Sequence, residues 1–329
     1  MEQNPYKKQF PELMRGKRIM YVHGFASSAQ SGTVGRLCET FPEADVVAFD
    51  LPVDPHEALA LLKKKCDELQ PDLILGTSMG GMYTEQLCGF DRIVVNPALR
   101  IADTMREHNM MGKQTFLNPR QDGVQEFYVD KALVKEYRDV SEQAFLTVED
   151  DRVWGLFGDK DPLVNTFDLF REHYSQAIRF HGEHRMDDHS FMHAVVPVIR
   201  WIDDRQEQRQ RPIVFISFDA MHDDYMKPVS SLQKVVGRLI ELYNVYFYAP
   251  CPTNDHAYAD RVQTWLEQFI AVPAYDHVVF TNQPQLLYGD YFIMKKKGEE
   301  MMGATIEFGS DDFKTWEEIL VYFERLGGQ

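Results

Sequence analysis

Residues 73–82 of this chain have the sequence "LILGTSMGGM". Three apolar residues lead into a glycine-flanked serine, Ser78, and a helix-compatible run, "MYTEQLC", completes the pattern of strand, tight turn and helix. Gly76 and Gly80 stand two residues before and after Ser78, in a G-x-S-x-G arrangement that lets a serine occupy a strained turn. The stretch therefore predicts that Ser78 is a nucleophile. It also places the N–H of Met79 at a helix N-terminus, where it can donate to a developing oxyanion.

Short β-rich runs alternate with helix-length amphipathic segments along the whole chain, which predicts an α/β fold with parallel sheets. In the first half, strands are expected at about 18–22, 45–50, 72–76, 92–96, 153–158 and 177–181. The segment 99–150 is the exception, because it reads as helical pieces inserted between two consecutive strands. Such an insertion predicts a lid.

A polar run near 204–211, "DRQEQRQR", follows a predicted helix over 190–203 and precedes a new strand, "PIVFISFD". The sequence thus predicts a domain over 1–204, a linker over 205–211 and a second domain over 212–329. The second domain is expected to be a small Rossmann-like sheet. Its strands are predicted near 213–219, 245–250, 277–281, 290–294 and 304–308, and its helices near 229–243, 257–270 and 315–326.

The composition excludes several classes of function. A net charge of -16 does not suit a nucleic-acid-binding surface. The four cysteines lack CxxC spacing, which favours reduced thiols over disulfides or a zinc site. No segment has the apolar core of a signal peptide or a membrane span. We expect a cytoplasmic protein that has neither nucleic acid nor membrane as a partner, and homo-oligomerisation stays open.

A second oxyanion donor is expected in the loop after the first strand, where "HGF" places His23, Gly24 and Phe25. Gly24 allows a close backbone approach, so the N–H of Phe25 is the predicted donor. We interpret the His23 side chain as a turn residue that hydrogen-bonds the loop rather than the substrate.

The stretch "WGLFGDKDPLVN" provides the acid of a catalytic triad. Asp161 follows a predicted strand in a G-x-x-D-x-x-V arrangement, a position from which a carboxylate can meet an imidazole. Asp159 is the rival and is otherwise interpreted as a solvated turn residue. Asp161 is favoured.

The stretch "HGEHRMDDHSFMHAVV" contains four histidines that can serve as the base. His189 is favoured because it opens the last helix of the domain, a position from which it can reach back over the sheet. His181 lies at a strand end, His184 in the following loop and His193 one helical turn later. The order Ser78, Asp161, His189 is the order of the α/β hydrolases.

Together "YVHGFASSAQSGT", "LILGTSMGGMYTEQL", "VVNPAL", "GDKDPLV" and "DHSF" resemble the small bacterial esterases of the YqiA/YcfP type, within the α/β-hydrolase superfamily. The resemblance covers about residues 1–203. It implies hydrolysis of carboxylic esters or thioesters on a compact sheet without a metal or a cofactor, and a small acyl ester or thioester as the substrate.

Residues 211–326 resemble the HAD superfamily, especially its small deoxyribonucleotidase-like members. The resemblance implies an aspartate nucleophile and an aspartate acid/base at the end of the first strand, where this chain has Ser217 and Asp219. Thr281 fits the second motif of the family. The positions expected to hold Mg²⁺ ligands carry Met294 and the lysines 295–297.

These departures predict a catalytically inactive second domain, retained for packing or self-association. A vestigial phosphate site at Ser217, Asp219 and Thr281 is the alternative. For the whole chain, the sequence predicts a serine carboxylesterase or thioesterase that uses an acyl-enzyme. The alternatives are a bifunctional hydrolase with a phosphatase-like second domain and a non-catalytic binding or scaffold protein.

Overall fold

The computed structural model describes residues 7–270, 277–295 and 300–326. The chain divides into two compact units, 1–203 and 204–329, close to the boundary predicted from the sequence. Helix α8 (Val196–Gln206) continues through the point of division, so the predicted linker begins inside a helix. Asp204 accepts hydrogen bonds from Arg209 and Arg211 at 2.6 and 2.7 Å, which orders the polar run that follows this helix.

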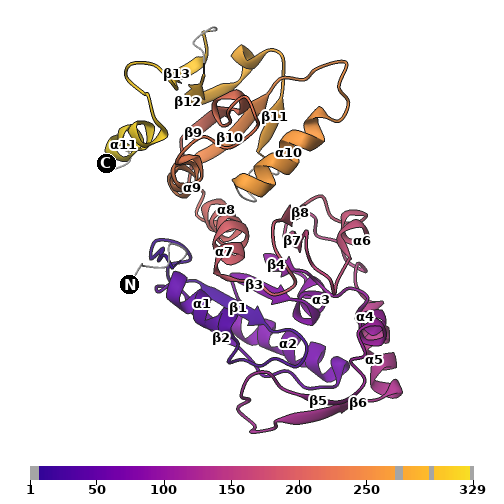
Figure 1. Ribbon diagram of the computed structural model, residues 1–329. Helices are drawn as coiled ribbons and strands as arrows, with labels where there is room; N and C mark the ends of the chain where they lie inside the picture. The colour runs from indigo at the N-terminus through magenta and orange to yellow at the C-terminus, as the bar shows by residue number, and fades with distance from the viewer. Residues whose placement is uncertain (1–6, 271–276, 296–299, 327–329) are drawn as a thin grey trace. The chain divides into compact units, whose positions relative to one another are not determined.

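The first unit is built on a parallel sheet of six strands (Figure 1). Near-continuous apolar sequences form these strands, because both faces of a parallel sheet are covered. All six predicted strands are confirmed. In spatial order they are β2 (Asp45–Ala48), β1 (Arg18–Val22), β3 (Leu73–Thr77), β4 (Arg92–Val95), β7 (Val153–Gly158) and β8 (Ala177–Phe180).

Helices connect the strands of this sheet. Local signals fix their ends: at the start of α2, the Asp54 carboxylate accepts from the amides of His56 and Glu57, and Pro55 occupies the first helical position. Besides α8, the helices are α1 (Gly32–Thr40), α2 (Pro55–Leu69), α3 (Met79–Glu85), α4 (Ile101–Glu107), α5 (Lys131–Ser141), α6 (Phe167–Arg171), α7 (Asp188–Ser190) and a π-helical turn, Phe191–Val195.

The segment 99–150 is not wholly helical, and this part of the prediction is wrong. Between α4 and α5 it forms an antiparallel hairpin of β5 (Gly112–Thr115) and β6 (Glu126–Val129). Helix α4 ends at Glu107, and Asn109 follows it with a left-handed φ of 52°; Gly112, with a φ of 92°, then begins β5.

The two helices of this segment belong to the core of the first unit. Both contribute buried side chains to a hydrophobic cluster that covers one face of the sheet. This cluster also contains Met20 of β1 and Ile74 of β3. The two helices' members of that cluster are Ile101, Ala102, Met105, Val134, Tyr137 and Val140.

The second unit is a five-stranded parallel sheet (Figure 1). Its strands, in spatial order, are β11 (Val278–Phe280), β10 (Asn244–Ala249), β9 (Ile213–Ser217), β12 (Tyr288–Met294) and β13 (Met302–Glu307). Its helices are α9 (Leu232–Leu242), α10 (Tyr258–Phe269) and α11 (Trp316–Leu326), with 3₁₀ turns at Phe218–Ala220 and Pro284–Leu286. The strand order reverses between β9 and β12, which makes the end of β9 the switch point of a doubly wound sheet.

Candidate active site

Ser78 sits in a strained turn between β3 and α3. Its φ and ψ angles are 55° and -120°, a conformation that non-glycine residues rarely adopt. A side chain at Gly76 would overlap Thr84 and the carbonyl of Gly80, and a side chain at Gly80 would overlap the carbonyls of Val22 and His23. The two glycines therefore let the helix approach the sheet closely enough to form the turn.

Two hydrogen bonds connect Ser78 to an imidazole and a carboxylate. His184 Nε2 lies 3.1 Å from Ser78 Oγ, and His184 Nδ1 lies 2.7 Å from Asp161 Oδ2. The other carboxylate oxygen of Asp161 accepts from the amides of Leu163 and Val164 at 2.8 and 3.0 Å. Because an ionised carboxylate only accepts, Nδ1 carries the hydrogen and Nε2 is free to accept from the serine hydroxyl.

This geometry corrects the position predicted for the base. His184, in the loop between β8 and α7, occupies the place next to Ser78 that the sequence assigned to His189. His189 lies in α7 and stacks on His193, with ring centroids 4.3 Å apart. The sequence prediction rested on the position of His189 at the start of the last helix of the domain. The histidine that contacts Ser78 instead lies in the loop that leaves β8 at the edge of the sheet.

Asp161, rather than its rival Asp159, contacts this histidine. The side chain of Asp161 is 2% exposed, whereas that of Asp159 is 41% exposed. Asp159 instead accepts from His181 Nδ1 at 2.9 Å and from the amide of Gly182 at 3.0 Å. These two bonds connect Asp159, which directly follows β7, to the turn that follows β8.

A buried asparagine that the sequence did not single out holds the histidine loop. Asn96 follows β4 with a φ of 45° and is 2% exposed. Its Nδ2 donates to the carbonyls of Glu183 and His184 at 3.1 and 3.2 Å, and its Oδ1 accepts from the amide of Gly158 at 2.7 Å. Asn96 thus joins the ends of β4 and β7 to the backbone of His184. In the sequence, Asn96 belongs to "VVNPAL", one of the stretches that resemble the esterases, but no local pattern predicts that it holds the histidine loop.

The loop after β1 lies beside the nucleophile. A side chain on Gly24 would come within 3.3 Å of Ser78 Cβ, so the glycine permits the close approach of this loop. The amide of Phe25 follows directly, and Met79 is the first residue of α3, so its N–H has no acceptor within the helix. Both predicted oxyanion donors therefore belong to backbone segments next to Ser78.

His23 is a buried residue of the same loop. Its Nδ1 donates to the carbonyl of Gly24 at 2.9 Å, and its Nε2 accepts from the amide of Leu51 at 3.2 Å. Burial lowers the pKa of His23, which favours the neutral ring that this pair of hydrogen bonds requires. His23 therefore ties the loop to the end of β2, as the sequence interpretation expected.

The β5–β6 hairpin is fastened to the Phe25 loop. Phe127 of β6 packs edge-on against Phe25, with ring centroids 5.4 Å apart. The amide of Leu117 donates to the carbonyl of Ala26 at 2.7 Å, and Ser28 Oγ donates to the carbonyl of Pro119 at 2.6 Å. The hairpin therefore supports the segment that carries one of the predicted oxyanion donors.

The second unit brings its predicted residues to one edge of its sheet. Ser217 ends β9 and donates a hydrogen bond from Oγ to Asp219. Thr281 follows β11, where its Oγ1 accepts from the amide of Gln283 at 2.9 Å. Met294 ends β12 one residue beyond the pairing of Ile293 with Ile216, so it lies next to Ser217.

Among the described residues, this edge of the sheet has no cluster of acidic side chains typical of a magnesium site. Within residues 7–270, 277–295 and 300–326, no three His, Cys, Asp or Glu side chains gather in a way that could hold a metal ion. Lys295, which follows β12, is exposed, and Lys296 and Lys297 lie outside the described residues.

In the described part of the chain, no helix has both the length and the apolar character that crossing a bilayer requires.

Residues 18–199 match a family described as "Uncharacterised protein family (UPF0227)". A protein of Vibrio phage KVP40 named "Putative 5'(3')-deoxyribonucleotidase" is 26% identical over 101 residues, which is 30% of this chain. The match covers 59% of the phage protein, less than two thirds of its length.

Several solved structures of hydrolases resemble this chain at low identity. The thioesterase domain from the curacin biosynthetic pathway is 16% identical, with a TM-score of 0.36 over 59% of this chain and 92% of that domain. Est1E from Butyrivibrio proteoclasticus is 14% identical, with a TM-score of 0.39 over 63% and 90%. A soluble variant of monoglyceride lipase from Saccharomyces cerevisiae is 13% identical, with a TM-score of 0.40 over 60% and 89%.

Proposed function

We propose that this chain, which belongs to the UPF0227 family, is a serine hydrolase that cleaves carboxylic esters or thioesters through an acyl-enzyme. The observation that carries the proposal is the pair of hydrogen bonds that joins Ser78 Oγ to His184 and His184 to Asp161. A nucleophile, a base and an orienting acid in this order are the parts that acyl transfer requires.

The reaction follows from these contacts. His184 Nε2 takes the hydroxyl proton as Ser78 Oγ attacks the acyl carbonyl, and Asp161 stabilises the imidazolium that forms. The amides of Phe25 and Met79 donate to the oxyanion of the tetrahedral intermediate, a contribution of about 2.7–4 kcal/mol for each donor in comparable sites. His184 then protonates the leaving alcohol or thiol. Water deprotonated by the same histidine releases the acid and restores the serine.

The β5–β6 hairpin is the proposed determinant of acyl selectivity. Phe25 supplies a predicted oxyanion amide, and its ring packs on the ring of Phe127. The ring centroids of Phe127 and Phe116 lie 4.6 Å apart. An aromatic cluster this close to the oxyanion loop favours a small apolar acyl group as the substrate.

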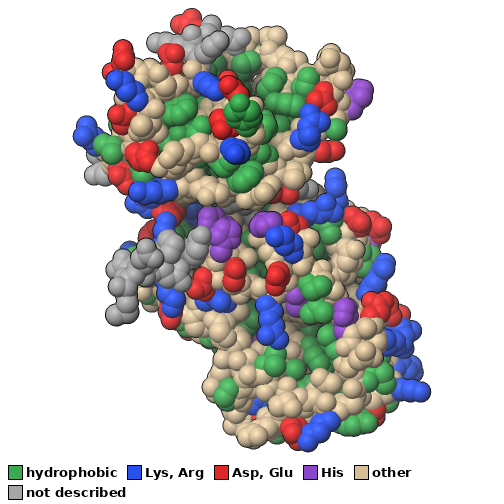
Figure 2. Space-filling view, in the orientation of Figure 1, with side chains coloured by type: hydrophobic (Ala, Val, Ile, Leu, Met, Phe, Trp, Pro, Cys, Tyr) green, Lys and Arg blue, Asp and Glu red, His purple; other side chains and the backbone are tan. Residues whose placement is uncertain are grey.

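The surface charge agrees with a small-molecule substrate. The chain carries a net charge of -16, and acidic and basic side chains are interspersed on the face shown in Figure 2. Nucleic-acid-binding surfaces instead gather lysine and arginine into one patch.

For the second unit we propose a HAD-like sheet without phosphatase activity. Ser217 cannot form an acyl-phosphate, and Met294 offers no oxygen to Mg²⁺. This favours the single-activity hydrolase over the bifunctional alternative. The complete hydrogen-bonded constellation in the first unit argues against a purely binding or scaffold protein.

Two histidine variants test the proposal. In the full chain, His184→Ala is expected to lower kcat on p-nitrophenyl acetate at least about 10³-fold, because the serine loses its base. His189→Ala serves as the comparison, and His181→Ala, which removes an exposed histidine of the same region, serves as the control. Both are expected to stay within about threefold of the unaltered protein. Loss of activity in His189→Ala with retention in His184→Ala would instead favour the base suggested by the sequence.

A further inference from the structure

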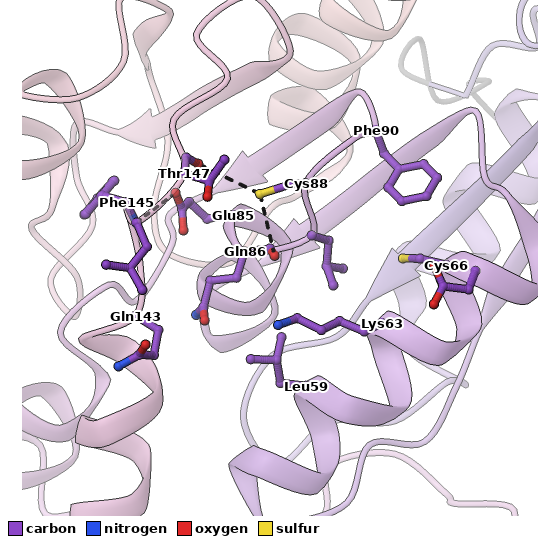
Figure 3. Close-up of a pocket in the computed structure, with 13 residues that line it drawn as sticks. Leu59, Lys63, Cys66, Glu85, Gln86, Cys88, Phe90, Gln143, Phe145 and Thr147 are labelled. Carbon is purple, nitrogen blue, oxygen red and sulfur yellow. Dashed lines mark hydrogen bonds between the residues drawn. The ribbon is translucent and has the colours of Figure 1, made fainter.

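A cavity in the first unit lies at the C-terminal end of α3. Ser78 precedes the first residue of α3, whereas the cavity lies at its last residue, Glu85, about 10 Å further along the helix axis. The cavity has a volume of about 470 Å³, within the range of small-molecule sites. Its walls include Leu59, Lys63, Gln86, Phe90, Gln143 and Phe145 (Figure 3).

The cavity contains a buried carboxyl group with one satisfied and one unsatisfied oxygen. Glu85 is 1% exposed, and its carboxyl lies beside Phe145 and Thr147 in Figure 3. Oε1 accepts from the hydroxyl of Tyr174 at 2.7 Å and from the amide of Phe145 at 3.2 Å. Oε2 has no hydrogen-bond partner among the described residues. An unpaired buried polar atom costs about 1–3 kcal/mol, so it is an unusual feature of a folded protein.

The protonation state of Glu85 decides what would satisfy Oε2. Burial raises the pKa of Glu85, which favours the uncharged acid, whereas the hydrogen bonds from Tyr174 and Phe145 and the charges of Arg92 and His173 act to lower it. Because Oε1 already accepts two hydrogen bonds, the proton of the acid belongs on Oε2. The unsatisfied atom is then a hydrogen-bond donor, and the partner it lacks is an acceptor.

The charges around the cavity disfavour an ionic partner. The buried guanidinium of Arg92 donates to the main-chain carbonyl of Glu85 and is paired with Glu149, whereas Lys63 lines the wall, so a cation would meet the positive charge of Lys63. An anion would meet the carboxylate of Asp67, which also lines the cavity. An uncharged partner meets neither penalty.

We propose that this cavity binds a small uncharged amphipathic molecule through a carbonyl or hydroxyl oxygen that accepts a hydrogen bond from Glu85. The apolar part of the molecule contacts Leu59, Phe90 and Phe145. The residues involved are separate from Ser78, Asp161 and His184, so the proposal does not depend on the hydrolase activity.

Benzamide and benzamidine form a matched pair of probes, because they share size and planarity but only benzamide is uncharged with a carbonyl acceptor. Titration of the ¹⁵N-labelled full chain is followed at the amides of Leu87, Cys88 and Thr147, which line the cavity. At pH 6, benzamide is expected to shift these amides and to bind at least about tenfold more tightly than benzamidine. Its affinity is expected to fall as the pH rises and Glu85 loses the proton that it donates.

Variants of Glu85 complete the test. Glu85→Gln keeps the shape and an N–H donor, so benzamide binding is expected to persist without its pH dependence, whereas Glu85→Met is expected to abolish it. Glu57→Gln, an exposed glutamate in the first turn of α2, is the control and is expected to bind as the unaltered chain does. Stronger binding of benzamidine, no shift of the three amides with either probe, or a pH dependence that survives in Glu85→Gln would overturn the proposal.

Discussion

Asn96 forms hydrogen bonds with three backbone groups whose relative positions matter for the proposed chemistry. Its two donor bonds reach the loop carrying His184, and its acceptor bond holds the amide of Gly158 at the end of β7, three residues before Asp161. A buried side-chain amide with three good hydrogen bonds fixes its surroundings more firmly than packing alone. In the proposed mechanism, Asn96 therefore positions the base.

Replacement of this side chain is expected to lower kcat more than it changes KM. In Asn96→Ala, we expect kcat on p-nitrophenyl acetate to fall about 10- to 100-fold, because His184 loses its tether and spends less time in reach of Ser78. Steady-state kinetics separate the two constants. Asn165→Ala, an exposed asparagine in the loop after Asp161, is the control. A raised KM with unchanged kcat would assign Asn96 to substrate binding instead.

Sequence patterns predicted the residues of the site that depend on local geometry. The turn at Ser78 requires glycines at fixed offsets, so its sequence shows its shape. Asp161 was likewise identified by the short loop that it stabilises. The choice between His184 and His189 depends on the path of a loop held by Asn96, 88 residues away from His184 in sequence. A contact between residues so far apart in the chain produces no pattern in the sequence near either residue.

The β5–β6 hairpin supports the loop after β1, which carries the proposed oxyanion donor Phe25. Besides the contact of Phe127 with Phe25, Asn118 Nδ2 donates to Ser27 Oγ at 3.1 Å, and the amide of Gln121 donates to Asp50 at 2.6 Å. The hairpin tip is thus bonded to the loops after both β1 and β2. If the segment 99–150 acts as a lid, as the sequence predicts, these hydrogen bonds and the aromatic contact connect that lid to the loops after β1 and β2.

Loss of the aromatic contact is expected to weaken catalysis. In Phe127→Ala, we expect kcat/KM on p-nitrophenyl acetate to fall about tenfold, since the Phe25 amide becomes less well placed for the oxyanion. Tyr128→Ala removes the next side chain of the same strand, which is 68% exposed, and is expected to have little effect. Equal losses in both variants would show that the strand as a whole matters, not the ring contact.

The elements that the sequence predicted well are those with a strong period or a buried apolar run. The six strands of the first sheet have such runs, whereas β5 and β6 are short and half exposed, with "GKQT" and "EFYV" as their sequences. Each of these two segments has only a weak strand signal in its own sequence, and the hairpin forms because the two pair with each other. The helical interpretation of 99–150 therefore captured α4 and α5 and missed the strands between them.

At the scale of the whole molecule, the two units differ in the chemistry that their sheet edges can support. The first unit ends its strands in the hydrogen-bonded set of Ser78, His184 and Asp161. The second unit ends β9 in Ser217 and β12 in Met294, with Asp219 as the acidic group bonded to Ser217. Mg²⁺ binding in proteins relies on several oxygen ligands with negative charge.

Phosphatase activity is therefore expected to be absent. The full chain, assayed with p-nitrophenyl phosphate and deoxynucleoside monophosphates at millimolar Mg²⁺, should show no turnover above that of Asp219→Asn. Because Mg²⁺ has too few ligands here, calorimetric titration with the ion should show no binding heat. Magnesium-dependent turnover that disappears in Asp219→Asn would mean that the second unit is an active enzyme.

Intact-mass analysis of the full chain after fluorophosphonate treatment tests whether Ser78 is a covalent nucleophile. In the proposed mechanism, the strained turn and the contact with His184 activate Ser78, so we expect a single adduct on the 38.3 kDa chain and none on Ser78→Ala. His184→Ala should react far more slowly. An unaltered chain that stays unmodified, or an adduct that persists in Ser78→Ala, would contradict the account.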